Sequence, residues 1–437
     1  MGESILEKHE KRITPFRYIK HKAMSIPKGQ LRFSAIELFF WAAFAASAFT
    51  AAYLQELGHN AKTVGTIMAC VNVVGLIASP VMGSLSDRMQ SARRVFLICI
   101  LGASVFFTIV PLIPGTSAVA TVAMAAVLVS FAFFKNPTSS LLDSWIIRTI
   151  DRRRTFKYGS VRLMGSFGYA TMCIIFGVIA SRLGTQRYSF FFYAALNIPL
   201  LLLCVMGMQD EREDEKRRRG EVAGKREKKE KKKGQSPLLL ALKGYYFRMF
   251  LISHALLGMT LYCMTTFLPY KLTEIAGNAD SLGLVIALKS YMEIPTFLFG
   301  AMIMRKIDIR KLFPICATVF VTEQVICLFA GSVWQVALSL MMHGFTYGMY
   351  LTCMVNYVYR VTPREASASA MAICGSLQLG MSVIGSVLGG MLVDAFGSAG
   401  YYTFSVVIQT IALGAFLVTH PLARKLGYPE PDLEGVA

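Results

Sequence analysis

The chain has 437 residues, of which 54% are hydrophobic and only 16% are charged. This composition excludes a water-soluble protein of this length, because so many apolar side chains do not fit into one core. The formal net charge of +19 does not indicate nucleic-acid binding, since the positions of the basic residues follow the rule for membrane proteins. A lipid bilayer is therefore the expected surroundings.

The apolar residues occur in blocks of about twenty, the length that crosses a hydrocarbon layer of about 30 Å as a helix. We predict an all-α membrane protein with twelve transmembrane helices. The predicted spans are 33–55, 63–85, 94–113, 117–147, 159–181, 187–208, 247–270, 281–304, 312–331, 333–358, 366–392 and 399–420. The fourth span is interrupted around Lys135, Asn136 and Pro137, because proline breaks the helical hydrogen-bond ladder.

The basic residues predict the orientation of these spans. With a cytoplasmic N-terminus, most of the 45 Lys and Arg lie on the cytoplasmic side, as the positive-inside rule requires. The exceptions are Lys62, Arg182, Arg187 and Lys271 in external loops, and Lys135, Arg162 and Lys289 inside helices. We expect a multi-pass protein of the cell or inner membrane with both termini in the cytoplasm.

A charged stretch, QDEREDEKRRRGEVAGKREKKEKKKGQ, separates the sixth span from the seventh. It has almost no apolar residue and cannot form a core, so it is predicted to be a cytoplasmic linker. The expected organisation is an N-terminal segment (1–32), a six-helix bundle (33–208), the linker (209–246), a second six-helix bundle (247–420) and a tail (421–437).

A weak internal repeat supports two related halves. GSLSDRMQSARR at 83–94 follows the second span, and GAMIMRKIDIRK at 300–311 follows the eighth. The corresponding pairs are Gly83 with Gly300, Arg88 with Arg305, Arg93 with Arg310 and Arg94 with Lys311. A duplication of this kind is typical of transporters with two pseudo-symmetric bundles.

GSLSDR and the later basic pair resemble the loop motif of the major facilitator superfamily, and GGMLVDAFG at 389–397 resembles the end of its eleventh helix. The resemblance covers nearly the whole chain and implies the major facilitator fold. It also implies gating roles for a small set of residues, namely Gly83, Asp87, Arg88, Arg93 and Arg94. The second copy departs from the pattern, because Met304 replaces the acid.

Asp143 and Arg162 are charges expected at equal depth in the membrane. Asp143 precedes the basic cluster that begins at Arg148 by five residues, and Arg162 follows its end at Lys157 by five. At 1.5 Å per residue, both side chains lie about 7 Å inside the same interface, where they can meet. Ionisable residues at this depth mark transport pathways by default. The alternative is a structural ion pair that joins two helices.

The stretch around Arg162 resembles the fifth helix of the lactose-permease branch, the oligosaccharide:proton symporters. That resemblance implies that Arg162 and Asp143 bind a sugar and that Tyr169 stacks on its ring, although the galactoside carriers have tryptophan there. Lys135 lies eight residues before Asp143, on roughly the same helix face. We expect it to line the same cavity.

The second half has its own membrane-embedded polar residues. Lys289 and Glu293 are four residues apart and share a helix face, which suits a place beside the substrate or mutual pairing. His343 resembles the tenth-helix histidine of the lactose-permease branch, but Thr346 replaces the coupling glutamate one turn later. Glu293, Glu323 and His343 are therefore the candidates for proton coupling, with packing as the alternative role for His343. For Glu37, near the start of the first span, we expect snorkelling to the interface.

The predicted function is secondary active transport by alternating access, in which protons drive uptake of a small polar solute such as a sugar or glycoside. The alternatives are a nucleoside:proton symporter and a drug or solute exporter of the same fold. The exporter is disfavoured because TMCIIFGVIASRLG lacks the proline of the exporters' fifth-helix signature.

A membrane enzyme or a non-transporting sensor is a remote alternative. The nine cysteines are scattered singly, and no metal-ligand spacing or activated nucleophile is present in the sequence. The segments outside the spans are too short for a signalling domain. We therefore expect no enzymatic activity, no cofactor and no metal, and a monomer whose partners are its solute, protons and the bilayer.

Overall fold

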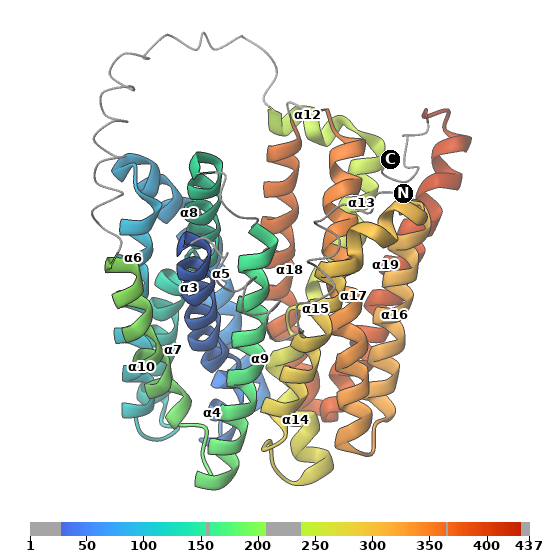
Figure 1. Cartoon of the computed structure of the whole chain (residues 1–437). Helices are drawn as coiled ribbons and strands as arrows, with labels where there is room; N and C mark the ends of the chain where they lie inside the picture. The colour runs from blue at the N-terminus through green and yellow to red at the C-terminus, as the bar shows by residue number, and fades with distance from the viewer. Residues whose placement is uncertain (1–27, 154–157, 207–236, 364–365, 430–437) are drawn as a thin grey trace, which may run out of the picture.

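A computed structural model describes residues 28–153, 158–206, 237–363 and 366–429 of the chain. These residues form a bundle of helices, without a β-strand in the described ranges (Figure 1). Twelve helical passes can be followed through the bundle, in agreement with the predicted fold class.

Six passes precede residue 206. The first is a chain of α3 (Lys28–Ala45), η1 (Ala46–Phe49) and α4 (Thr50–Glu56), followed by α5 (Ala61–Met89) and then α6 (Ala92–Ile109) with η2 (Val110–Leu112). The fourth pass contains α7 (Ala118–Lys135) and α8 (Thr138–Arg153), and the last two are α9 (Tyr158–Leu183) and α10 (Tyr188–Val205). The predicted break around Lys135 is confirmed, because α7 ends there and α8 begins after Pro137.

The second group follows α12 (Pro237–Lys243), a short helix in the range expected for the linker. Its passes are α13 (Tyr245–Leu261) with α14 (Met264–Ala276), α15 (Leu282–Lys306), α16 (Ile309–Phe329), α17 (Val333–Val361), α18 (Ser367–Phe396) and α19 (Ser398–Lys425). The axes of α13 and α14 differ by 41°. The predicted span 247–270 contains no such break.

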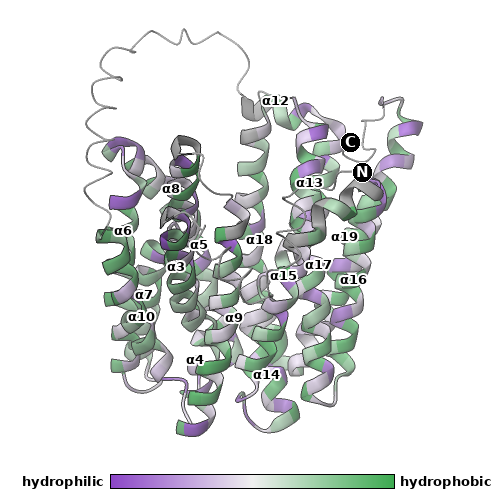
Figure 2. Cartoon of the chain, in the orientation of Figure 1, coloured by the Kyte–Doolittle hydropathy of each residue, from purple (hydrophilic) through white to green (hydrophobic). Residues whose placement is uncertain are grey.

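The helix surfaces are those of a membrane protein. In the described chain, nine helices are long and apolar enough to span a bilayer, or ten if α13 and α14 count as one span. Large apolar side chains point outward, as shown by exposed fractions of 69% for Val122, 58% for Leu202 and 78% for Phe329. Figure 2 shows hydrophobic residues along the outer helices and polar residues near helix ends. Such an apolar surface is stable against lipid chains, whereas its exposure to water would be unfavourable.

One placement in the sequence analysis is wrong. Lys271 was expected in an external loop, but α14 continues to Ala276 and buries this side chain to 6% exposure. Its ammonium donates a hydrogen bond to the carbonyl oxygen of Leu328, at 3.3 Å. The prediction failed because the apolar run ends before the helix does.

The two halves pack mainly through two helix pairs, α5 with α18 and α9 with α15, and α14 adds smaller contacts with α4 and α5. We call the end of the bundle at Met89, Val205 and α12 the linker end, and the end at Glu56, Leu183 and Ala276 the far end (Figure 1).

Close contact of α9 with α15 needs glycine. A methyl group added to Gly283 would lie 2.2 Å from the carbonyl oxygen of Cys173 and 2.7 Å from the Cα of Gly177. Small residues permit such backbone contact.

Polar bonds also join the halves from the far end to the middle. Asp394 of α18 accepts hydrogen bonds from the backbone N–H groups of Ala61 and Lys62, at 2.7 and 3.0 Å. The carboxylate therefore caps the positive N-terminus of α5. Gln55 donates to Thr273 at 3.2 Å, Asn72 donates to Ser382 at 3.1 Å, and the hydroxyls of Thr171 and Tyr291 are 3.0 Å apart.

We predict that Gly283→Ala separates the far ends of the two halves. The added methyl group overlaps the backbone of α9, and overpacking of this kind costs about 1–3 kcal/mol. Because 1.4 kcal/mol changes an equilibrium constant tenfold, the ratio of closed to open molecules should fall by about tenfold. Disulfide formation between Gln55→Cys and Thr273→Cys, in a background without native cysteines, measures this closure.

Gly414→Ala is the matched control, because a methyl group at Gly414 meets no atom within 4 Å. It should cross-link as the parent does. Equal cross-linking in the Gly283 and Gly414 variants would show that the glycine contact does not hold the far end closed.

Candidate functional site

Arg162 lies near the linker end of α9, half-buried and surrounded by groups from several helices. Its guanidinium carbon is 4.3 Å from the centre of the Trp41 ring of α3. A guanidinium over an indole face is the most favourable cation–π arrangement in proteins. The indole thus holds one face of the Arg162 guanidinium, and the N–H groups at its edge can donate hydrogen bonds to other groups.

Gly165, one turn after Arg162, makes room for this arrangement. A methyl group at this position would lie 2.4 Å from Trp41 Cδ1, 2.8 Å from Glu37 Oε2 and 2.9 Å from Arg162 Nη1. Three functional side chains therefore share the space beside one glycine. At Gly168 a methyl group would come within 2.5 Å of the carbonyl oxygen of Leu38. These two glycines let α9 pack directly on α3.

Asp143 lies on α8 beside Arg162 but does not form an ion pair with it among the described residues. Its Oδ1 accepts a hydrogen bond of 2.7 Å from the hydroxyl of Tyr158. The aspartate and the guanidinium are close enough to interact electrostatically. The two side chains are therefore neighbours that do not neutralise each other through an ion pair. The free donors of Arg162 can face a ligand.

Tyr169 and Lys135 flank the same region. The ring of Tyr169 meets Trp41 edge-on, with centroids 6.4 Å apart. The ammonium of Lys135, at the end of α7, lies 3.9 Å from the centre of the Phe44 ring of α3. Phe44 itself packs on Trp41 at 4.9 Å. An aromatic cluster thus connects the three predicted residues Arg162, Tyr169 and Lys135.

The second half brings Lys289 and Glu293 of α15 toward this cluster. Glu293 interacts electrostatically with Lys289, with His343 and with Arg162 of the other half. The Lys289 ammonium is 5.9 Å from the centre of the Tyr347 ring. Lys289 and Glu293 therefore take part in one electrostatic network that crosses between the halves.

Glu323 and His343 form a buried pair within the second half. His343 Nδ1 is 2.6 Å from Glu323 Oε1, and the two side chains are 2% and 0% exposed. The same oxygen accepts a hydrogen bond of 2.9 Å from Gln324 Nε2. The imidazole ring stacks on Tyr347 at 5.6 Å. The Tyr347 ring also lies near the ammonium of Lys289. One tyrosine therefore lies between the Glu323–His343 pair and Lys289.

The predicted gating motif is located at the linker end of α5 and the start of α6. Asp87 pairs with Arg148 of α8 at 3.6 Å, within the first half, and its side chain is 76% exposed. Exposed pairs of this type contribute little stability. Arg93 is buried against the ring of Trp145, whereas Arg88 and Arg94 are exposed. A methyl group at Gly83 would meet no atom within 4 Å. The side chains at 304–306, in the second copy of the motif, lie outside the described residues.

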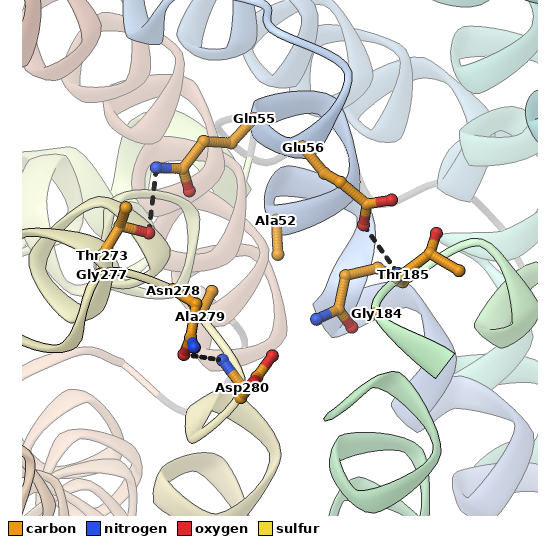
Figure 3. Close-up of a pocket in the computed structure, with 11 residues that line it drawn as sticks. Ala52, Gln55, Glu56, Gly184, Thr185, Thr273, Gly277, Asn278, Ala279 and Asp280 are labelled. Carbon is orange, nitrogen blue, oxygen red and sulfur yellow. Dashed lines mark hydrogen bonds between the residues drawn. The ribbon is translucent and has the colours of Figure 1, made fainter. Parts of the chain in front are cut away.

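Two cavities open at opposite ends of the bundle. One of about 310 Å³ lies at the far end between the halves, lined by α4, the segment after α9 and the turn at 277–280 (Figure 3). Glu56 closes one wall by accepting a hydrogen bond of 2.7 Å from the backbone of Gln186. A second cavity of about 560 Å³ runs along α18 at the linker end, beside Ser369, Ile373 and Ser376. None of the predicted binding residues lines either cavity.

Glu37 is a second residue, after Lys271, that lies elsewhere than predicted. It was expected to reach the interface, but its side chain is 0% exposed. The described part of the helix already includes Lys28, five residues before the predicted span, so Glu37 lies at least nine residues, or about 13 Å, along it. A second buried polar residue, His254, was missed because a lone histidine carries little signal. Its ring nitrogens lie 2.5 Å from Tyr350 Oη and 3.1 Å from the carbonyl oxygen of Cys374.

Comparison with known proteins identifies the architecture. The sequence profile of the MFS_1 like family matches residues 30–404. The maltose permease of Geobacillus stearothermophilus is 20% identical over 394 residues, which cover 89% of this chain and 94% of the permease. The lactose permease of Klebsiella oxytoca is 26% identical over 134 residues, or 30% of this chain and 32% of that protein.

Among solved structures, the crystal structure of nucleoside transporter NupG superposes with a TM-score of 0.72. It shares 12% sequence identity and covers 91% of this chain and 99% of its own. This likeness confirms the predicted twelve-helix fold with two six-helix bundles. The relatives are transporters rather than enzymes, which agrees with the predicted class.

We predict that Glu323→Leu destabilises the protein strongly, while Glu323→Gln does so mildly. Leucine leaves His343 Nδ1 and Gln324 Nε2 without their shared acceptor, and each unsatisfied buried group costs about 1–3 kcal/mol. Glutamine retains an acceptor oxygen of the same reach. Thermal unfolding in detergent should show a clear loss of Tm for leucine alone. Similar Tm values for both variants would mean that the pair contributes little to stability.

Proposed function

The chain belongs to the MFS_1 like family of membrane transporters, and on this premise we propose that it takes up a sugar or glycoside together with protons. The observation that carries the proposal is the setting of Arg162. Its guanidinium is fixed over an indole, has Asp143 at its side, and is half-buried rather than sealed. A planar fork and a carboxylate can hold adjacent hydroxyls, and the nearby rings of Trp41 and Tyr169 can stack on the apolar face of a sugar.

The substrate class is also supported by the sequence relatives, which include a maltose permease and lactose permeases. In this proposal Arg162, Asp143 and Tyr169 bind the solute from the first half. Lys135 and Lys289 border the same space and complete its polar lining. Solute enters between two halves that contribute charges of opposite sign, Arg162 from one and Glu293 from the other.

Proton coupling is assigned to the acidic residues of the second half and their histidine. Glu293 interacts with Arg162, with Lys289 and with His343, so its charge state affects the binding region and the Glu323–His343 pair together. Protonation of Glu293 or Glu323 outside the cell would favour solute binding. Loss of that proton inside would then reset the carrier.

The structure represents, in this proposal, the inward-facing conformation of an alternating-access cycle. The far end corresponds to the cell exterior and is closed by Asp394, by the Gln55–Thr273 bond and by the glycine contact of α9 with α15. The linker end, with its excess of basic residues and the cavity beside α18, faces the cytoplasm. Gly83, Asp87, Arg88, Arg93 and Arg94 act when this end closes.

A nucleoside is the second candidate for the solute. Trp41 and Tyr169 lie edge to face beside the guanidinium, and a nucleobase can stack on either ring as well as a sugar can. The fold likeness to a nucleoside transporter is compatible with this alternative. Both candidates use the same arginine and carboxylate.

We expect a bound solute to stabilise the purified protein against heat, and the stabilisation to require Arg162 and Asp143. Maltose, lactose, uridine and adenosine form the first panel. A solute at one hundred times its Kd adds about 2.7 kcal/mol to the folded state. Arg162→Lys removes the planar fork and Asp143→Asn removes the charge, so either should abolish the Tm increase.

Arg182→Lys is the matched control, because Arg182 is exposed at the other end of the same helix. It should keep the full response to the solute. If both site variants still respond like the parent, Asp143 and Arg162 serve the structure rather than the solute.

We further expect an imposed proton gradient to drive accumulation of this solute into proteoliposomes. Each unit of pH difference corresponds to about 1.4 kcal/mol per proton, or about tenfold accumulation for one proton per solute. Glu293→Gln should abolish accumulation and retain exchange of solute across the membrane. Uptake that ignores the gradient would remove proton coupling from the proposal.

A further inference from the structure

Glu37 is a buried acid to which the proposed function gives no role. It is 0% exposed, and neither carboxylate oxygen makes a hydrogen bond with the described part of the chain. An ionised carboxylate in this setting would be among the most expensive groups in the protein. A buried acid that is neither bonded nor exposed requires an explanation.

The partner available to Glu37 is Arg162. Glu37 Oε2 and Arg162 Nη1 lie on either side of the small space left by Gly165, and the two side chains interact electrostatically. The same guanidinium also interacts with Asp143 of α8. One cation is therefore shared by two carboxylates that come from different helices, α3 and α8.

In the part of the chain that the structure describes, the remaining groups around Glu37 do not supply a second positive charge. Tyr158 of α9 interacts with Glu37, but its hydroxyl is already donated to Asp143. Trp41 of α3 lies beside the carboxylate and under the guanidinium. The ammonium of Lys135 on α7 is placed over Phe44, seven residues or about 10 Å further along the first pass. On α10, which also packs on α3, the residues Tyr188–Val205 include no Lys, Arg, Asp or Glu.

This arrangement holds one negative charge too many when both acids are ionised. Two carboxylates that share a low-dielectric site with one cation retain a proton between them more readily than either does alone. Asp143 has a hydroxyl donor and partial exposure to stabilise its charge, whereas Glu37 has neither. Glu37 is thus the acid on which a proton is better placed.

We propose that Glu37 is a proton-binding positioning residue that sets the availability of Arg162. With a proton on Glu37, the guanidinium faces Asp143 and the half-exposed space beside it, where it can hold solute. With the proton released, the carboxylate draws the guanidinium toward α3 and away from solute. The proton is exchanged with water through the half-exposed region around Arg162 and Asp143. The part of this inference that couples the proton to solute binding rests on the proposed function. The titration of Glu37 does not depend on that function.

Trp41 provides a reporter for this rearrangement, because the guanidinium lies directly over its ring. The chain has three tryptophans, Trp41, Trp145 and Trp334. In a Trp145→Phe, Trp334→Phe background, emission from Trp41 can be followed in detergent across about pH 4 to 9, the range in which perturbed carboxylates titrate. No solute is needed for this measurement.

We expect a sigmoidal change in Trp41 emission in the parent, and loss of that change in Glu37→Gln, which mimics the protonated acid. Glu37→Asp should restore a titration with a displaced midpoint, which a merely structural role would not produce. Glu56→Gln, a matched change of an acid at the far end of the same half, should leave the curve unchanged. Size-exclusion profiles verify that each variant is folded.

Two results would overturn the proposal. A parent whose Trp41 emission is independent of pH would show that Glu37 does not titrate beside Arg162. A titration that persists in Glu37→Gln and disappears in Asp143→Asn would assign the proton to Asp143 instead. If the titration is found but no sugar or nucleoside is transported, the proton site stands and the proposed solute fails.

Discussion

A guanidinium inside a membrane must be compensated by the protein, since lipid offers no counter-charge and no acceptor. Around Arg162 this requirement determines much of the first half. Trp41 of α3 offers its ring face, α8 brings Asp143, and the glycines of α9 allow α3 to approach. Glu293 extends the same charge network into the second half. The contact of α3 with α9 is thus built around one positive charge.

The sequence was sufficient to predict the fold and several residues around Arg162, because the relevant signals are strong and local. Blocks of apolar residues give the number of helices, and a charge within an apolar block stands out. Asp143 and Arg162 were placed at equal depth by simple counting from one basic cluster. Pro137 likewise predicted the break between α7 and α8 from local chemistry alone.

Other features depend on packing between segments far apart in the chain. Glu37 lies close to the predicted start of a span, and only the contact of α3 with α9 shows that it is buried. The place of Lys271 depends on the carbonyl of Leu328, which belongs to another helix. Asp394 was part of a motif, yet its role as a cap for α5 could not be deduced because the two helices are more than three hundred residues apart. Hydropathy indicates how far along its own helix a residue lies, but it does not indicate which other helix that residue contacts.

The cap formed by Asp394 has a consequence for motion. The first turn of α5 obtains hydrogen-bond acceptors for two of its N–H groups from a helix in the other half. When the halves separate at this end, those amides lose their acceptors and meet water. Opening is then a local loosening of one helix end as well as a rotation of two rigid bundles. The amide hydrogens of Ala61 and Lys62 would exchange with solvent each time the halves separate at this end, so their exchange rate would record how often they do.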